Sequence, residues 1–344
     1  MGQEYYTVGR LCFLQKDEEN KMLAAVLLFL LGFVLLIKGG DWFVDGSVGI
    51  AHRFNLPELL IGATVVSIGT TLPEVMVSSQ AALQHNAGIS YGNAIGSIIC
   101  NTSLIAAITI AVKPGNVSRK SLRLPAAAFF LAAVIYSLIA YTQGEFKRWQ
   151  GLMYLAMFVV YMFLSVKAMQ SGDMEAEGEE EEEEKKESTL TKDIILLVVG
   201  AAAIAVGANL LVNNGTIIAA ALGVPDSVIG LTMVALGTSL PELVTAITSL
   251  MKGHGALSLG NVIGANLFNI ILVSGMAISI SPFKIPAEKT IMGMNSSLVI
   301  DIPVMMAVML LLCVPALKNE KLYRWQGITL LCIYAAFTLY QFFI

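Results

Sequence analysis

The passage GTTLPE at residues 69–74 returns as GTSLPE at residues 237–242, and a second repeated passage follows each copy. GNAIGSIICN at residues 92–101 corresponds to GNVIGANLFN at residues 260–269. One shift of 168 residues aligns both pairs, and between 57–101 and 225–269, 16 of 45 residues are identical. The chain therefore consists of two related halves, and each half carries one glutamate within an apolar stretch.

The composition points to a membrane protein. Hydrophobic residues make up 56% of the chain, charged residues only 13%, and the mean hydropathy is +0.74. Soluble domains carry about 25% charged residues, so one globular core cannot hide this apolar surface and lipid must cover much of it. No basic stripe indicates nucleic acid as a partner. The four cysteines are scattered, without the spacing of a disulfide framework or a zinc site.

Ten segments are apolar enough to cross a bilayer, which takes about 20 mostly apolar residues. We therefore expect an all-α membrane protein with ten transmembrane helices, five in each half. Because five is odd, the second half must enter the membrane from the opposite side, which gives two inverted-topology repeats. The ten predicted segments are 22–39, 57–83, 90–112, 122–142, 149–169, 191–213, 225–251, 257–280, 294–317 and 324–344.

The domain organisation follows from this pattern. Ten of the chain's 25 acidic residues lie in the linker between the halves, and such blocks of like charge stay solvated. Lys and Arg are enriched on the linker side, so the positive-inside rule predicts a cytoplasmic linker, with both termini outside the cell membrane. The predicted parts are a polar N-terminal leader at 1–21, a first five-helix repeat at 22–169 with its motif region at 57–112, the acidic linker at 170–190, and a second five-helix repeat at 191–344 with its motif region at 225–280.

The duplicated glutamates, Glu74 and Glu242, are the strongest functional signal. Ionisable groups within a membrane are expensive to keep, so they indicate a functional site by default. Pro73 and Pro241 precede them, and a proline removes one backbone donor, so we expect each helix to be interrupted there. Carbonyls freed in this way would add oxygen atoms beside the two carboxylates.

Neutral oxygen donors accompany the two acids. Hydroxyl residues lie three and four positions before each glutamate, which places them on the same helix face. Asn93 and Asn101 are two helical turns apart, and Asn261 and Asn269 repeat that spacing. No His or Cys joins the set. Oxygen-only ligands suit hard cations such as Ca²⁺ and Na⁺, and they suit Zn²⁺ and Cu⁺ poorly.

These paired motifs resemble the alpha-1 and alpha-2 repeats of the sodium/calcium exchangers, in the cation/Ca²⁺ antiporter superfamily. The resemblance implies an inverted five-plus-five helix fold with Ca²⁺ and Na⁺ bound at the membrane midplane as transported ions, and no cofactor. Carried over motif by motif, it implies the ion ligands Thr70, Thr71, Glu74, Ser97, Asn101, Thr238, Ser239, Glu242 and Asn269.

Two positions depart from the pattern of the family. Ala265 stands where a serine is frequent, which removes one hydroxyl. Asn269 stands where some members, including potassium-dependent ones, carry aspartate, which lowers the charge of the site and weakens the case for K⁺ transport. The short acidic linker in place of a large regulatory domain resembles prokaryotic members.

We therefore expect a secondary active antiporter, not an enzyme, that exchanges Ca²⁺ for Na⁺ by alternating access, with a monomeric transport unit. A Ca²⁺/H⁺ antiporter of the same fold is the alternative, because two buried glutamates could carry protons. An intramembrane hydrolase would need a nucleophile or metal-binding histidines, and a channel normally uses symmetric rings of ligands. Asp301 has no acidic counterpart, and we expect it to make a polar contact between helices.

Overall fold

The computed structural model describes residues 2–170, 189–223, 237–287, 290–291 and 293–343. Helices dominate these residues, with two pairs of two-residue strands, so the all-α membrane fold is confirmed. Eight helices in the described residues are long and apolar enough to cross a membrane. The count of ten is not confirmed. The predicted segment 225–251 lies partly outside the described residues, and helix α15 covers residues 324–343 of the last predicted segment, 324–344.

The first repeat spans α1 to α7. Near the acidic motif, α2, η1 and α3 follow one another without a break, and so do α4, η2 and α5. The elements are α1 (Gly2–Arg53), α2 (Glu58–Ile61), the π-helical η1 (Gly62–Val66), α3 (Ser67–Leu83), α4 (Ala87–Cys100), the π-helical η2 (Asn101–Ala106), α5 (Ala107–Val112), α6 (Arg119–Gln143), β1 (Glu145–Phe146) and α7 (Arg148–Gln170).

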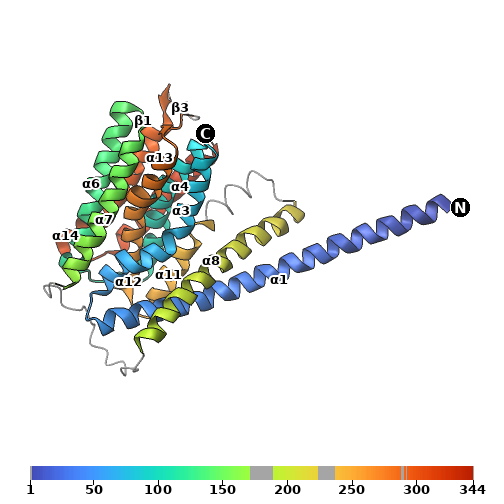
Figure 1. The fold of residues 1–344 in the computed structure, drawn as a ribbon, viewed down its shortest axis with the longest axis horizontal. Coiled ribbons are helices and arrows are strands. Elements are labelled where there is room, and N and C mark those ends of the chain that lie inside the picture. Colours follow the sequence, from blue (N-terminus) through green and yellow to red (C-terminus); the bar gives the residue numbers. More distant parts are fainter. Residues whose placement is uncertain (1, 171–188, 224–236, 288–289, 292, 344) are drawn as a thin grey trace.

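The second repeat begins at α8, and its described helices follow one another in a corresponding order, with additional strands between α13 and α14. Figure 1 shows its helices interleaved with those of the first repeat in one bundle. The elements are α8 (Leu190–Ala221), α11 (Leu240–Met251), α12 (Gly255–Phe268), the π-helical η4 (Asn269–Ser274), α13 (Gly275–Ile280), β2 (Phe283–Lys284), β3 (Thr290–Ile291), β4 (Met294–Asn295), the π-helical η5 (Ser297–Asp301), α14 (Ile302–Asn319) and α15 (Arg324–Phe343).

One local expectation was wrong. Pro73 does not interrupt its helix, because α3 runs from Ser67 through the proline to Leu83. The backbone departs from α-helical geometry elsewhere, in the π-helical segments. Asn101 begins η2 and Asn269 begins η4, at positions related by the shift of 168 residues. The same π-helical distortion therefore occurs in both copies of the repeat. Such turns are frequent at functional sites.

Helices α1 and α8 pack on each other with their backbones in close contact. A Cβ atom at Gly39 would lie 3.0 Å from the carbonyl oxygen of Gly200, and one at Gly32 would lie 2.8 Å from that of Gly207. Lower numbers in α1 meet higher numbers in α8, so the two helices run antiparallel. Because they are the equivalent first helices of the two repeats, this pairing shows the inverted topology.

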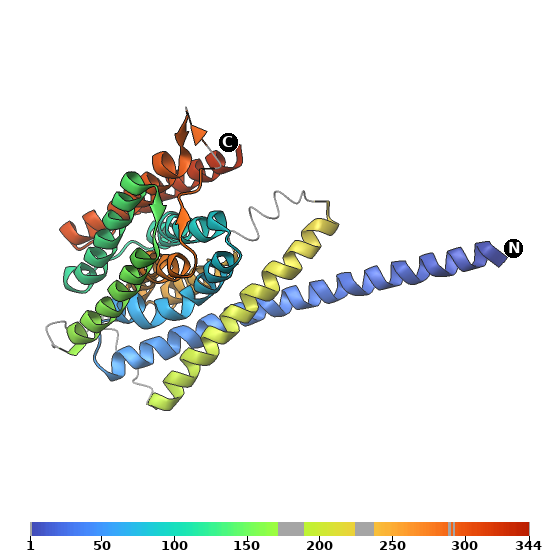
Figure 2. The same ribbon diagram turned by 45° about the horizontal axis from the view of Figure 1, so that its top comes forward.

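The α1–α8 pair lies along one side of the bundle in both views (Figures 1 and 2), and α1 projects well beyond it toward the N-terminus. The predicted leader, 1–21, lies within this helix from Gly2 onward. The main hydrophobic core fills the bundle between α4, α6, α7, α12 and α14. A separate, smaller apolar cluster, which includes Phe43 and Ile204, lies between the α1–α8 pair and the bundle. The pair is therefore an outer layer on the core that holds the acidic motifs.

Candidate ion-binding site

Glu74 and Glu242 come together inside the bundle. Glu74 lies on α3 and Glu242 in the first turn of α11, and both side chains are fully buried. The two carboxylates are close enough to act on each other electrostatically. Within the described residues, neither oxygen of either carboxylate has a hydrogen-bond partner. Buried acceptors without partners are rare and costly in folded proteins, so this pair points to a bound cation.

Four of the five predicted hydroxyl ligands are buried. Thr71 is buried on α3, and its Oγ1 has no partner among the described residues. Ser239, at the start of α11, is also buried with an unpartnered Oγ. Ser97 is buried on α4 and Thr70 on α3, while Thr238 is only half-buried.

The two asparagines of the second motif take equivalent places. Asn101 and Asn269 are fully buried at the first residue of their π-helical segments. Neither Oδ1 has a partner in the described part of the chain, although the Nδ2 of Asn269 donates to the carbonyl of Ala265 at 3.0 Å. Cys100, next to Asn101, lies within electrostatic range of both carboxylates. Both amide oxygens are therefore buried and without a partner among the described residues.

Asn261 is a residue of this region that the predicted ligand set leaves out. Its Oδ1 accepts a hydrogen bond from Thr70 at 3.1 Å, and its backbone oxygen accepts one from Ser67 at 3.0 Å. These bonds join α3 of the first repeat to α12 of the second. The repeated asparagine was visible in the sequence, but spacing alone does not tell which helix an amide faces. Thr70 is thus engaged in a contact between the repeats.

The repeat-related asparagine, Asn93, has a different contact. Its Nδ2 donates to the backbone oxygen of Glu74 at 3.1 Å and to the hydroxyl of Ser78 at 2.8 Å. Asn93 therefore holds the helix turn that carries the first acid. The buried Oγ1 of Thr245, one turn after Glu242, is a further unpartnered donor and acceptor that sequence reasoning missed. Its first-repeat counterpart is Val77, so the repeat gave no signal for it.

The α1–α8 pair closes the site from one side. A small cavity of about 10 Å³ separates Phe43 of α1 and Ile204 of α8 from Thr70, Pro73 and Pro241. Both motif prolines thus face the glycine-rich pair.

Other acidic residues lie apart from this constellation. Asp301 accepts a hydrogen bond from Gln341 at 3.1 Å, so the predicted polar contact between helices is confirmed. Asp41 and Asp45 of α1 pair with Lys252 after α11. No cluster of three or more His, Cys, Asp or Glu side chains in the described residues could hold a metal ion. The candidate is therefore a site of two carboxylates supplemented by neutral oxygens.

Inverted helical repeats around a buried pair of carboxylates define a class, the secondary cation transporters built from repeats. Comparison with known proteins agrees. A family model described as sodium/calcium exchanger protein matches residues 24–167 and 192–343. The chain therefore belongs to the sodium/calcium exchanger family. It is a multi-pass membrane antiporter for Ca²⁺ and a counter-cation, not an enzyme, and transporters of this family need no cofactor.

Individual relatives span almost the whole chain. The sodium/calcium exchanger MaX1 of Methanosarcina acetivorans is 34% identical over 92% of this chain and 98% of its own length. An uncharacterised membrane protein of Methanocaldococcus jannaschii is 37% identical over 89% and 94%. A solved structure of the sodium-calcium exchanger NCX_Mj, soaked with Na⁺ and Sr²⁺, gives a TM-score of 0.78 at 34% identity and covers 92% of this chain and 98% of that one.

Proposed function

We propose that this antiporter exchanges Ca²⁺ for Na⁺ at one midplane site, with Glu74 and Glu242 as the central ligands. The observation that carries the proposal is the meeting of two repeat-related carboxylates, both buried and both without partners among the described residues. One Ca²⁺ balances two carboxylates, and so do two Na⁺. Ions that compete for the same pair of charges cannot occupy it together, which is the minimum that an exchanger needs.

The neutral oxygens support Ca²⁺ and Na⁺ over smaller or softer cations. Ca²⁺ accepts six to eight oxygen ligands in flexible geometry, whereas Mg²⁺ keeps several waters in a strict octahedron. Buried hydroxyl and amide oxygens that have no partner among the described residues, such as those of Thr71, Ser239 and Asn101, support such a shell. The proposed ligands are Thr70, Thr71, Glu74, Ser97, Asn101, Thr238, Ser239, Glu242 and Asn269.

The residues of the second repeat argue against K⁺ as a third ion. Asn269 contributes a neutral amide where an aspartate would add a charge, and Ala265 contributes no side-chain oxygen. The site then has two negative charges in all, enough for one Ca²⁺ or two monovalent ions. A further monovalent cation would stay uncompensated in a low-dielectric interior.

Alternating access would come from the α1–α8 pair. The pair is tightly joined within itself and rests on the bundle through an apolar cluster, so it can shift as one body over the motif prolines. Apolar surfaces slide more easily than surfaces locked by directional hydrogen bonds.

The names of relatives such as MaX1 and NCX_Mj support exchange of sodium and calcium by this chain.

The decisive test uses purified protein in liposomes loaded with Na⁺. We expect an outward Na⁺ gradient to drive ⁴⁵Ca²⁺ uptake, and uptake to vanish when choline replaces Na⁺. A pH gradient imposed without sodium separates the second candidate, a Ca²⁺/H⁺ antiporter. Uptake driven by the pH gradient alone would show that H⁺ is the coupling ion instead of Na⁺, and it would contradict the proposal.

The orientation is part of the proposal. We place the linker 170–190 in the cytoplasm and both termini outside, because Lys and Arg are enriched on the linker side. In intact cells, Gln170→Cys introduced into a variant whose four native cysteines are replaced by serine should resist a membrane-impermeant thiol reagent until the membrane is permeabilised. Labelling in intact cells would reverse the assignment. We also propose that one chain forms the transport unit, since both halves of the site lie in it.

A further inference from the structure

Three buried hydroxyls continue from the ion site along one hairpin of helices. Thr245 and Ser249 lie one and two turns after Glu242 on α11, so they share a face of that helix with the acid. Ser258 lies on α12, the other arm of the hairpin. We call Thr245, Ser249 and Ser258 the hydroxyl line. All three side chains are buried, and none of their hydroxyl oxygens has a hydrogen-bond partner among the described residues.

Hydroxyl side chains in other helices of the chain bond their own backbone. Ser47 and Ser279 each donate to the carbonyl four residues back at 2.7 Å, and Thr64 does so at 2.6 Å. Thr245 and Ser249 make no such bond, although they too lie in a helix. Because a buried hydroxyl without a partner costs free energy, these two oxygens point to a partner from outside the described chain.

The related hairpin of the first repeat, α3 and α4, has no such line. By the shift of 168 residues, Thr245 corresponds to Val77 and Ser249 to Ala81, so apolar side chains take both places. The two hairpins have the same fold and differ in these side chains. The hydroxyl line is therefore a property of the second repeat and not a requirement of the hairpin.

The third hydroxyl has a counterpart that is satisfied within the chain. Ser258 corresponds to Ser90, whose Oγ donates to the backbone oxygen of Ser78 at 3.1 Å. Ser78 corresponds to Ala246, and Ser258 makes no equivalent bond to it. In the first repeat this contact closes the hairpin on itself. In the second repeat the hydroxyl stays available to a ligand.

The hydroxyl line lies at the border between the bundle and the α1–α8 pair. On α11, Val244 faces α1, since a Cβ atom at Gly40 would lie 2.7 Å from its Cγ1. Ala246 belongs to the main hydrophobic core. At about 100° per residue, Thr245 and Ser249 lie between these two faces of the helix. A shift of α1 over α11 would therefore uncover them.

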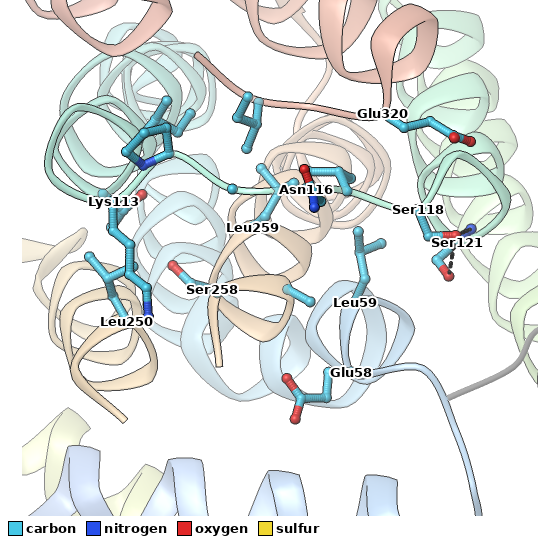
Figure 3. Close-up of a pocket in the computed structure, with 18 of the residues that line it drawn as sticks. Glu58, Leu59, Lys113, Asn116, Ser118, Ser121, Leu250, Ser258, Leu259 and Glu320 are labelled. Carbon is cyan, nitrogen blue, oxygen red and sulfur yellow. Dashed lines mark hydrogen bonds between the residues drawn. The ribbon is translucent and has the colours of Figure 1, made fainter. Parts of the chain in front are cut away.

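The line leads from the acids toward one end of the bundle. With a rise of about 1.5 Å per residue, Ser249 lies about 10 Å from Glu242 along the helix axis. Beyond it, Leu250 and Ser258 are among the residues around a hollow of about 830 Å³ (Figure 3). The three hydroxyl oxygens themselves are shut off from solvent, so the line is closed in this structure.

We propose that the hydroxyl line is a transit site for a partly hydrated cation that moves between the carboxylates and the end of the bundle where α11 ends. This inference rests on the proposed exchange at Glu74 and Glu242. Hydroxyls offer a cation neutral oxygens and bond its remaining waters, and because they carry no charge they release the ion again. Ion paths need such weak binding at several positions. Since the first repeat has no hydroxyl line, the transit site serves one face of the membrane.

The first test measures access to Ser249→Cys in a variant whose four native cysteines are replaced by serine. A cationic, membrane-impermeant methanethiosulfonate is applied to intact cells and to inside-out vesicles. We expect modification only from the side that labels Gln170→Cys, because α7 and α11 end at the same face of the membrane. Ala81→Cys is the matched control and should stay unmodified. A Ser249→Cys variant that reacts from neither side, from the other side, or no faster than Ala81→Cys would overturn the proposal.

The second test replaces the two hydroxyls of α11 by the side chains of the first repeat, with Thr245→Val and Ser249→Ala together. We expect the maximal rate of Na⁺-driven Ca²⁺ uptake to fall about tenfold and the apparent Ca²⁺ affinity to stay within about twofold, because two weak ion contacts are lost outside the ion site. The melting temperature should stay the same or rise, since unpartnered hydroxyls leave the interior. Thr142→Val with Ser137→Ala is the matched control, because both hydroxyls bond carbonyls of their own helix, α6.

An unchanged uptake rate in the double variant would overturn the transit site. A slower rate together with a lower melting temperature would also overturn it, since the hydroxyls would then only hold α11 in place. If the unaltered protein shows no Na⁺-driven uptake, the proposed exchange fails instead. The cysteine test needs no transport, so it still decides whether the hydroxyl line meets the solution at one end.

Discussion

The ion site consists of buried polar side chains, whereas the α1–α8 interface is built around glycines. At the ion site, carboxylates, hydroxyls and amides are buried without partners among the described residues. Between α1 and α8, glycines bring two backbones together, and a Cβ at Gly200 would lie 2.5 Å from the backbone nitrogen of Phe43. The first region leaves polar groups available to a ligand. The second leaves no room for change within the pair, so any movement must take place between the pair and the bundle.

The largest effect is expected at the acids. Glu74→Gln or Glu242→Gln should lower Na⁺-driven Ca²⁺ flux by at least about 100-fold, because each change removes one charge that would contact the ion. A charge contact near 4 Å is worth about 4 kcal/mol at an effective dielectric of 20, and about 1.4 kcal/mol corresponds to a tenfold change in affinity. Flux assays in liposomes measure this. Glu145→Gln, at a half-buried carboxylate that pairs with Lys147 outside the ion site, is the control. Near-normal flux in Glu74→Gln would remove the central ligand from the proposal.

The next effect tests the tight packing within the pair. Gly39→Leu should destabilise the protein by about 1–3 kcal/mol, because overpacking forces the backbones of α1 and α8 apart. The melting temperature of the purified protein measures this, and transport should fall with it. Gly92→Ala in α4 is the matched control, since a Cβ there meets nothing within 4 Å. An unchanged melting temperature in Gly39→Leu would mean that the pair is loosely joined.

A moderate effect is expected where the repeats meet. Asn261→Ala removes the acceptor of Thr70 and should cost about 1–2 kcal/mol, seen as a loss of apparent Ca²⁺ affinity of about tenfold. Concentration dependence of uptake measures it. Ser137→Ala, whose hydroxyl bonds only within its own helix, serves as control. An unchanged apparent Ca²⁺ affinity in Asn261→Ala would show that the contact with Asn261 does not position Thr70 for ion binding.

The smallest effect is expected at the polar link between α1 and the bundle. The Nζ of Lys252 lies 2.7 Å from Asp45 and 3.5 Å from Asp41, and both aspartates are exposed. Exposed ion pairs are worth about 0–1 kcal/mol, so Lys252→Ala should change the turnover rate less than about fivefold, and less again in high salt. A larger change that persists in high salt would show that this link, and not apolar packing, controls the movement of α1.

Particular residues show how far sequence reasoning reached. The duplicated motifs predicted the inverted repeats and the two acids, because polar groups that recur within apolar segments have no cheaper explanation. Pro73 misled, since α3 continues through it. Asn261 and Thr245 were not assigned, because the direction of a buried side chain depends on the rotation of its helix against neighbours far away in the chain.

What the amino-acid sequence determined by itself is the membrane location, the doubling of the fold and the kind of ligand, since these depend on hydropathy, repetition and the chemistry of oxygen atoms. Tertiary structure alone decided three further things. It brought Glu74 within electrostatic range of Glu242, it turned Asn261 toward Thr70, and it turned Asn93 toward the backbone oxygen of Glu74. Equivalent residues in the two repeats face different neighbours, and packing between distant helices, which no local pattern encodes, selects among them.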